Sequence, residues 1–269
     1  MEVHPMKQKL RLVLLLLSAS VFLFSGWKLT TILLSYQESS ESYSSLSQYV
    51  SFETPPTVGT DVPPALEETI PTEPKPDVSR WPQVDFEELA QINPDVVGWI
   101  YIEGTNINYP LVQGQDNDHY LTHLFNGKRN RAGSIFLDYR CEPRFYDRHT
   151  IIYGHHLRDG TMFTRLMRYK KQAFYDEHSV ILVVTPTAYL QLRVFSGYVA
   201  SNRANAWDLE LDEENFAQWL EEIQRKSCFK TDYAPGADSK IVTLSTCTYE
   251  FDNAKFLLHA YVEEYIERE

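Results

Sequence analysis

The apolar positions of the chain form one long run near the N-terminus and many short runs in its last two thirds. The long run extends from Leu12 to Leu34 and holds a single charge, Lys28, whose ammonium can reach the lipid headgroups. Its length is about the 20 residues that a helix needs to cross a bilayer. The pattern therefore predicts a cytoplasmic basic tail at residues 1–11 and a transmembrane signal anchor at residues 12–34.

A cleaved secretory signal is the competing interpretation of this segment. The basic residues Lys7, Lys9 and Arg11 and the apolar core suit both readings. No clear small-x-small cleavage site precedes the polar region, which favours the uncleaved anchor. Because a basic flank stays in the cytoplasm, the rest of the chain is predicted to lie outside the cell, tethered to the cell membrane by a single pass.

Residues 35–80 change in character, with Ser, Gln, Glu and Tyr first and repeated Pro among acidic residues afterwards. Such a composition buries too little apolar surface to offset the entropy of ordering. We predict a disordered stalk here, which would hold a folded domain at residues 81–269 away from the membrane.

The folded domain begins with a short helix, Phe86 to Ile92, capped by Asp85 and ended by Asn93-Pro94. Short apolar runs separated by turn signals then predict a mainly β fold whose strands close into a barrel. The predicted strands are Val96 to Ile102, Ile107 to Val112, Ser134 to Asp138, His149 to Tyr153, Val180 to Thr185, Tyr189 to Ala200, Lys240 to Leu244 and Phe256 to Val262. Two helices interrupt them, at Phe163 to Lys171 and at Asp212 to Lys226, and the second has a core-facing apolar stripe.

Composition excludes some classes of function. The formal net charge of −12 argues against nucleic acid as a partner, because phosphate contacts need a basic face. The three cysteines, Cys141, Cys228 and Cys247, have no ligand-like spacing, so no zinc site is predicted and a Cys141–Cys228 disulfide stays open. We expect no metal and no cofactor.

Cys247 stands where a β-branched strand gives way to a loop, which makes it a candidate nucleophile. An Asp-Asn turn signal and a second strand follow, so the segment is predicted to be a hairpin with Lys255 on the opposite rim. His155 ends another apolar strand far upstream, in a matching position. A thiol, an imidazole and a cation are the groups that nucleophilic catalysis by cysteine needs.

Several motifs together resemble a class B sortase, a cysteine transpeptidase of Gram-positive cell surfaces. They are T-L-S-T-C at 243–247, Y-G-H at 153–155, D-G-T-M-F at 159–163, D-V-V-G-W-I at 95–100, I-N-Y-P-L-V-Q-G at 107–114 and A-G-S-I-F-L-D at 132–138. The resemblance implies an eight-stranded sortase β-barrel with a helix inserted in the connection before the cysteine strand. It also implies that Cys247 attacks the Thr carbonyl of a C-terminal sorting signal, and that His155, rather than its neighbour His156, transfers the protons.

The family has arginine at the third catalytic position, where this chain has Lys255. Lysine keeps the charge and loses the planar fork of donors, so reduced turnover is the hypothesis that follows. The resemblance and the strand period add four candidate substrate-binding residues, which are Ser245, Asn117, Leu121 and the amide of Thr248 as an oxyanion donor. For Asn117 and Leu121, a capping amide and a core residue are equally good interpretations.

The expected partners are surface proteins that carry a sorting signal, together with an amine of a peptidoglycan precursor or of a pilin. A cysteine endopeptidase that resolves the thioester with water would use the same residues. A binding module weakened in catalysis by Lys255 is the third interpretation. The sorting motif, the acceptor and the choice between wall anchoring and pilus assembly are not encoded in any pattern that we identify.

Overall fold

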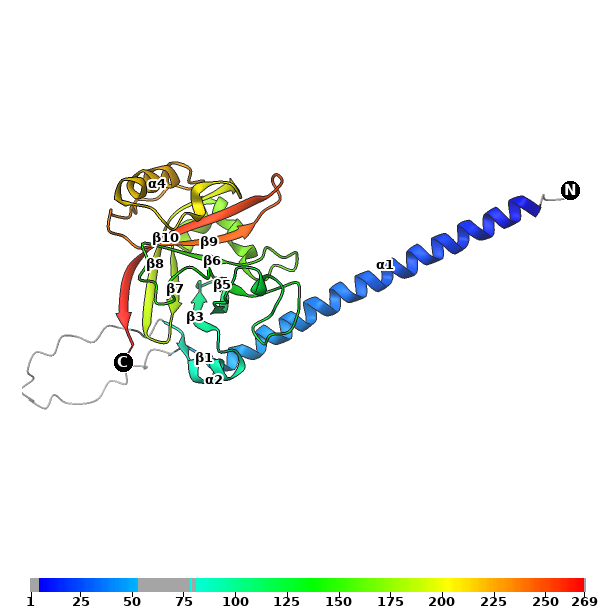
Figure 1. Cartoon of the computed structure of the whole chain (residues 1–269), viewed down its shortest axis with the longest axis horizontal. Coiled ribbons are helices and arrows are strands. Elements are labelled where there is room, and N and C mark those ends of the chain that lie inside the picture. The colour runs from blue at the N-terminus through cyan, green and yellow to red at the C-terminus, as the bar shows by residue number, and fades with distance from the viewer. Residues whose placement is uncertain (1–4, 53–77, 79–80, 269) are drawn as a thin grey trace, which may run out of the picture.

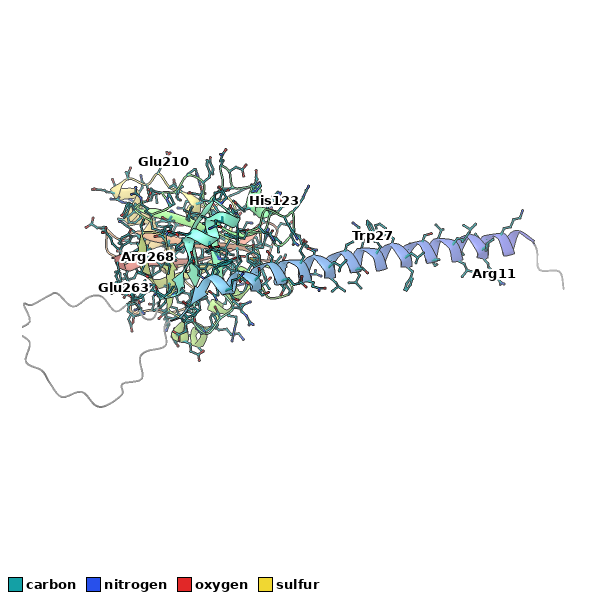
Figure 2. All side chains as sticks on the ribbon, turned by 90° about the horizontal axis from the view of Figure 1, so that it is seen from below. Arg11, Trp27, His123, Glu210, Glu263 and Arg268 are labelled. Carbon is teal, nitrogen blue, oxygen red and sulfur yellow. The ribbon has the colours of Figure 1, made fainter. Side chains whose placement is uncertain are left out.

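The computed structural model describes residues 5–52, 78 and 81–268. Its first element is one continuous helix, α1 (Pro5–Ser45), whose N-terminal part projects away from a β-rich head (Figure 1). Most large apolar side chains of α1 from Leu12 to Leu34 are exposed, and the stretch around Trp27 stands clear of the head (Figure 2). Within the described part of the chain, this is the one helix long and apolar enough to cross a membrane.

The predicted disorder is wrong for the part of the stalk that the structure describes. Helix α1 continues to Ser45, a 3-10 turn η1 (Leu46–Tyr49) follows, and β1 (Val50–Ser51) pairs with β2 (Gln83–Val84). The physical reason is burial, because Leu46 packs into the core of the head and Tyr43 packs beside it. Residues 53–77 and 79–80, the remainder of the predicted stalk, lie outside the described residues.

All the predicted strands form, and they close into an eight-stranded barrel in the order β10-β8-β7-β3-β4-β5-β6-β9. Their bounds are β3 (Val96–Tyr101), β4 (Asn108–Val112), β5 (Ile135–Leu137), β6 (His149–Tyr153), β7 (Val180–Val184), β8 (Ala188–Ser201), β9 (Ile241–Cys247) and β10 (Ala254–Glu267). Neighbours are antiparallel except β4 with β5 and β6 with β9. Strand β9 extends past its predicted end at Leu244 and carries the cysteine as its last residue.

The helices surround this barrel. Asp85 caps α2 (Phe86–Ile92) by accepting from the N–H of Glu88, as predicted. The predicted helix at 163–171 is a 3-10 helix, η3 (Phe163–Lys170), followed by α3 (Gln172–Glu177). Two further 3-10 turns are η2 (His119–Leu121) and η4 (Asn205–Trp207).

Helix α4 (Glu213–Arg225) lies in the connection before the cysteine strand, where it was expected. It buries Phe216, Trp219 and Ile223 in one hydrophobic cluster with residues of β8, β9 and β10. This packing covers one face of β9 and leaves the C-terminal end of that strand at the edge of the barrel.

Candidate active site

Two parallel neighbouring strands bring the predicted cysteine and histidine to one edge of the barrel. Strand β6 pairs with β9 so that Tyr153 is opposite Ser245, and the N–H of Gly154 donates to the Ser245 carbonyl at 3.1 Å. His155 and Cys247 each lie two residues beyond this pair, so both follow the same ends of two adjacent strands. The neighbouring His156 Nδ1 donates to the Cys247 carbonyl at 3.0 Å.

The cation of the site comes from the predicted hairpin. Lys255 is the direct register partner of Cys247 across β9 and β10. Its ammonium Nζ lies 3.0 Å from the Cys247 sulfur, and both side chains are half-buried. A positive charge at this distance can stabilise negative charge on the sulfur during a reaction.

The imidazole of His155 is oriented by a backbone carbonyl. Its Nε2 lies 2.7 Å from the carbonyl oxygen of Leu121. Because a carbonyl only accepts, Nε2 carries the hydrogen, and in the neutral ring Nδ1 holds the lone pair that can take up a proton. The Leu121 side chain is exposed, so its interpretation as a core residue is wrong, and its backbone holds the candidate base.

Close packing explains the glycine that precedes the histidine. A Cβ on Gly154 would lie 2.5 Å from the side chain of Ile135 and 2.6 Å from the ring of Phe163. Any larger residue would push the strand end away from these neighbours and displace the imidazole that follows.

The other candidate binding residues have partners within the protein. The buried Ser245 hydroxyl accepts from the indole Nε1 of Trp207 at 3.3 Å, and Ser245 shares the face of β9 with Cys247. The N–H of Thr248 donates to the Ala254 carbonyl at 3.0 Å, so it closes the hairpin and is not free for an oxyanion. The amide of Asn117 donates to the Asp138 carboxylate at 3.0 Å and its oxygen accepts from the Tyr139 N–H, so Asn117 contacts the segment after β5 and does not cap the neighbouring helix η2.

Sequence reasoning did not identify the aromatic turn beside the thiol. Tyr249 and Phe251 lie between β9 and β10, and the Tyr249 side chain is 75% exposed. The Tyr249 hydroxyl donates to the His156 carbonyl at 3.3 Å, and the two rings lie 5.2 Å apart. Two aromatic residues within four positions of a candidate nucleophile are the sequence signal that could have identified this part of the site.

A buried polar chain supports the cysteine strand from within. His149 donates from Nδ1 to the Asp208 carbonyl at 2.7 Å, so its Nε2 accepts from the Thr243 hydroxyl, also at 2.7 Å. The Thr243 oxygen in turn accepts from His259 Nδ1 at 2.8 Å. Burial lowers the pKa of His149 to about 4 and that of His259 well below its usual range, so both rings are neutral. The indole of Trp219 packs against both rings, and these bonds fix β9 to β6 and β10.

The remaining cysteines are separate from this site. Cys141 and Cys228 are both free, which answers the question of a disulfide, and burial raises the pKa of the Cys141 thiol to about 12. Among residues 5–52, 78 and 81–268, no group of three or more His, Cys, Asp or Glu side chains has the arrangement of a metal site.

Known proteins with similar sequences are sortases. The Sortase domain family model matches residues 100–263. Sortase B of Staphylococcus aureus is 43% identical over 164 residues, 60% of this chain and 67% of that protein. Sortase B of Listeria monocytogenes is 31% identical over 243 residues, 90% of this chain and 91% of that protein.

Solved structures of relatives agree with this match. The Staphylococcus aureus sortase B–substrate complex is 37% identical, has a TM-score of 0.63, and aligns with 68% of this chain and 85% of its own. A sortase B complexed with triglycine is also 37% identical with a TM-score of 0.63, and aligns with 68% and 86%.

Proposed function

This chain belongs to the sortase family as a class B sortase, a family of cysteine transpeptidases, and from that premise we propose which bond it cleaves and what it attaches. It cleaves a C-terminal sorting signal after Thr and transfers the protein to an amine of the cell wall or of a pilin. The observation that supports this most is the barrel edge formed by β6, β9 and β10. Strand β6 pairs with β9 up to Tyr153 and Ser245, two residues before His155 and Cys247, and the Lys255 ammonium lies 3.0 Å from the sulfur.

In the first half of the reaction, the Cys247 thiolate adds to the Thr carbonyl carbon of the signal. The carbon–nitrogen bond then breaks, and the leaving amine takes a proton from His155, which leaves a thioester on the enzyme. The Leu121 carbonyl accepts from Nε2 of His155 and so holds the ring in one orientation during this transfer.

In the second half, an amine attacks the thioester and gives its proton to His155. The bond between carbon and sulfur breaks and releases the thiolate, which the Lys255 ammonium stabilises. A sortase B relative complexed with triglycine supports a short amine-ended peptide as the acceptor.

Helix α1 supports a single-pass anchor with the head outside the cell. Its apolar stretch is preceded by Lys9 and Arg11, and basic flanks remain cytoplasmic. This arrangement would bring the reactive edge to substrates that emerge from the same membrane.

Mass spectrometry of the full chain in detergent micelles tests the proposal. The purified protein is incubated with a panel of peptides that carry Thr within a C-terminal signal, with and without triglycine. We expect an acyl adduct on Cys247 and, with triglycine, a ligated product, both lost in Cys247→Ala and retained in the matched control Cys228→Ala.

The same experiment separates the competing functions. Hydrolysed peptide with no ligated product would identify an endopeptidase. A bound peptide without any adduct on Cys247 would identify a binding module. Loss of the adduct in His156→Ala with retention in His155→Ala would reverse the assignment of the acid and base.

A further inference from the structure

The anchor helix is docked on the head through one loop of the barrel. The last turns of α1 contact residues 126–134, which join η2 to β5. The amide of Asn130 donates to the Ser35 carbonyl at 3.0 Å and to the Glu38 carboxylate at 3.2 Å. Asn126 donates to the Ser42 hydroxyl at 3.1 Å. These contacts hold the end of α1 against a segment that also approaches the candidate active site.

Tyr43 of α1 contacts the C-terminal end of this loop. Its hydroxyl donates to the Gly133 carbonyl at 2.6 Å and lies 3.1 Å from the Ser134 hydroxyl. Burial raises the pKa of Tyr43 well above its usual range, so the phenol remains a neutral donor. A hydrogen bond of this length with a desolvated donor fixes the loop relative to the helix.

Gly133 lies against the His155 ring and the Leu121 carbonyl that orients it. Its φ of +59° is in the left-handed region. A Cβ at this position would lie 2.8 Å from the Leu121 carbonyl oxygen and 3.0 Å from Cδ2 of the His155 ring. The residue that Tyr43 holds on one side therefore packs, on its other side, against the imidazole and the carbonyl that accepts from it.

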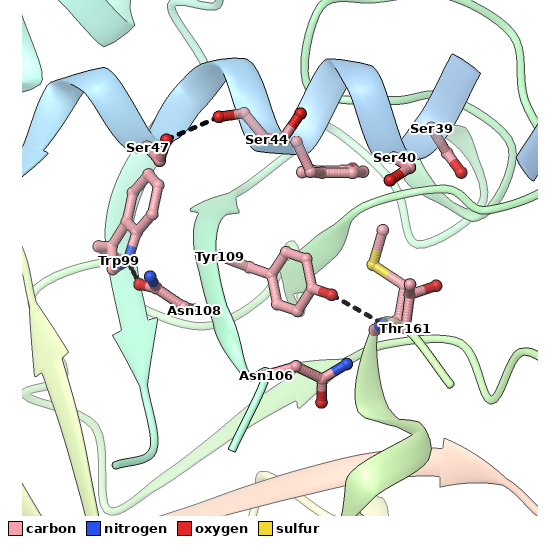
Figure 3. A pocket seen from close by; sticks show the side chains of 11 residues that line it. Ser39, Ser40, Ser44, Ser47, Trp99, Asn106, Asn108, Tyr109 and Thr161 are labelled. Carbon is pink, nitrogen blue, oxygen red and sulfur yellow. Dashed lines mark hydrogen bonds between the residues drawn. The ribbon is translucent and has the colours of Figure 1, made fainter. Parts of the chain in front are cut away.

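A second route starts from the ring of Tyr43. This ring packs edge-on against Tyr109, with centroids 5.4 Å apart. The Tyr109 hydroxyl accepts from the Met162 N–H at 3.1 Å, a bond visible beside Thr161 at the seam between α1 and the barrel (Figure 3). The next residue, Phe163, donates its N–H to the His155 carbonyl at 3.0 Å.

A cavity of about 300 Å³ lies along this seam, lined on the helix side by Ser39, Ser40, Ser44 and Ser47 (Figure 3). Tyr43 also lines it, so the ring is packed on one side and has space on the other. The bond to Gly133 and the contact with Tyr109 thus act on a side chain that also packs against the core of the head.

We propose that Tyr43 is a positioning residue for His155, through which docking of the membrane-anchor helix sets the orientation of the imidazole. One chain of contacts leads from Tyr43 through Gly133 to the His155 ring. The other leads from Tyr43 through Tyr109 and the Met162–Phe163 segment to the His155 backbone. The inference rests on the proposed function in one respect, that His155 transfers protons during transpeptidation.

The test compares the full chain with Tyr43→Phe in phospholipid nanodiscs. This variant keeps the ring and removes the donor. We expect kcat for peptide transfer to fall about tenfold with KM within about twofold. Tyr36→Phe is the matched control, because Tyr36 lies on the same helix with its ring 5.8 Å from the Arg131 guanidinium, and we expect it to behave as wild type.

A second readout does not depend on any sorting peptide. The rate of Cys247 alkylation by iodoacetamide is measured against pH, with the adduct located by mass spectrometry because Cys228 is also exposed. We expect the pH profile of Tyr43→Phe to differ in shape from that of wild type. A purely structural role would lower the melting temperature and leave the profile of the folded protein in place.

The outcomes separate the two proposals. If no peptide is transferred by wild type but the alkylation profile shifts in Tyr43→Phe, the transpeptidation proposal fails and the positioning role stands. Superimposable profiles and equal kcat for wild type and Tyr43→Phe would overturn the positioning role, as would the same change in Tyr36→Phe.

Discussion

Replacement of Lys255 by methionine tests the electrostatic basis of the site. The substitution keeps the length of the side chain and removes the charge that lies 3.0 Å from the Cys247 sulfur. Negative charge on the sulfur then loses the cation that contacts it, and we expect Cys247 to react more slowly with electrophiles.

The magnitude follows from the distance. At 3.0 Å, Coulomb's law gives about 1.4 kcal/mol in bulk water and about 5.5 kcal/mol at an effective dielectric constant of about 20. Both side chains are half-buried, so a value of about 3 kcal/mol between these limits is appropriate, which corresponds to roughly 100-fold in reaction rate.

The assay is the second-order rate of iodoacetamide alkylation of Cys247 at pH 7, at low and at high salt. We expect Lys255→Met to react roughly 30- to 100-fold more slowly, with a smaller difference at about 1 M salt because the charges are partly exposed to solvent. The exposed Lys171→Met is the control and should match wild type. Equal rates for Lys255→Met and wild type would refute the assignment of Lys255 as the stabilising cation.

Three further predictions follow. Lys255→Arg should raise kcat/KM for peptide acylation several-fold, because the guanidinium adds a forked donor, and unchanged kinetics would contradict this. Thr243→Val should lower the free energy of unfolding by about 2–4 kcal/mol in urea denaturation, because His149 and His259 each lose a buried partner. Burial places the pKa of His149 at about 4, below its unfolded value of about 6.5. The free energy of unfolding should therefore be highest above about pH 6.5 and fall by about 3 kcal/mol as the pH drops to about 4. Urea denaturation that gives the same free energy of unfolding across this range would contradict the prediction.

The barrel could be predicted because its strands are local patterns. Each is a short apolar or β-branched run between turn residues, and the pairing of Cys247 with Lys255 follows from a hairpin whose turn is a few residues long. The placement of β6 beside β9 is different, because these strands are parallel and far apart in sequence. The pattern indicates only that His155 and Cys247 each stand at the end of an apolar strand. The family resemblance implies that they act in one site.

The errors share one cause, which is that the partner lies far along the chain. Residues 35–52 have a polar composition typical of disorder, and they fold because Tyr43 and Leu46 pack against the head. Neither interpretation of Asn117, as a binding or a capping residue, included its contact with Asp138, which lies 21 positions further along the chain. Local propensity contains no information about such contacts.

The continuous helix α1 also fixes how far the head lies from the apolar stretch that precedes it. Tyr43 lies nine positions after Leu34, which at about 1.5 Å per residue places the docking point roughly 14 Å beyond the apolar stretch. In Figure 1 the hairpin of β9 and β10 extends toward the side on which α1 projects. One helix therefore sets both the spacing and the direction of this hairpin relative to the apolar stretch.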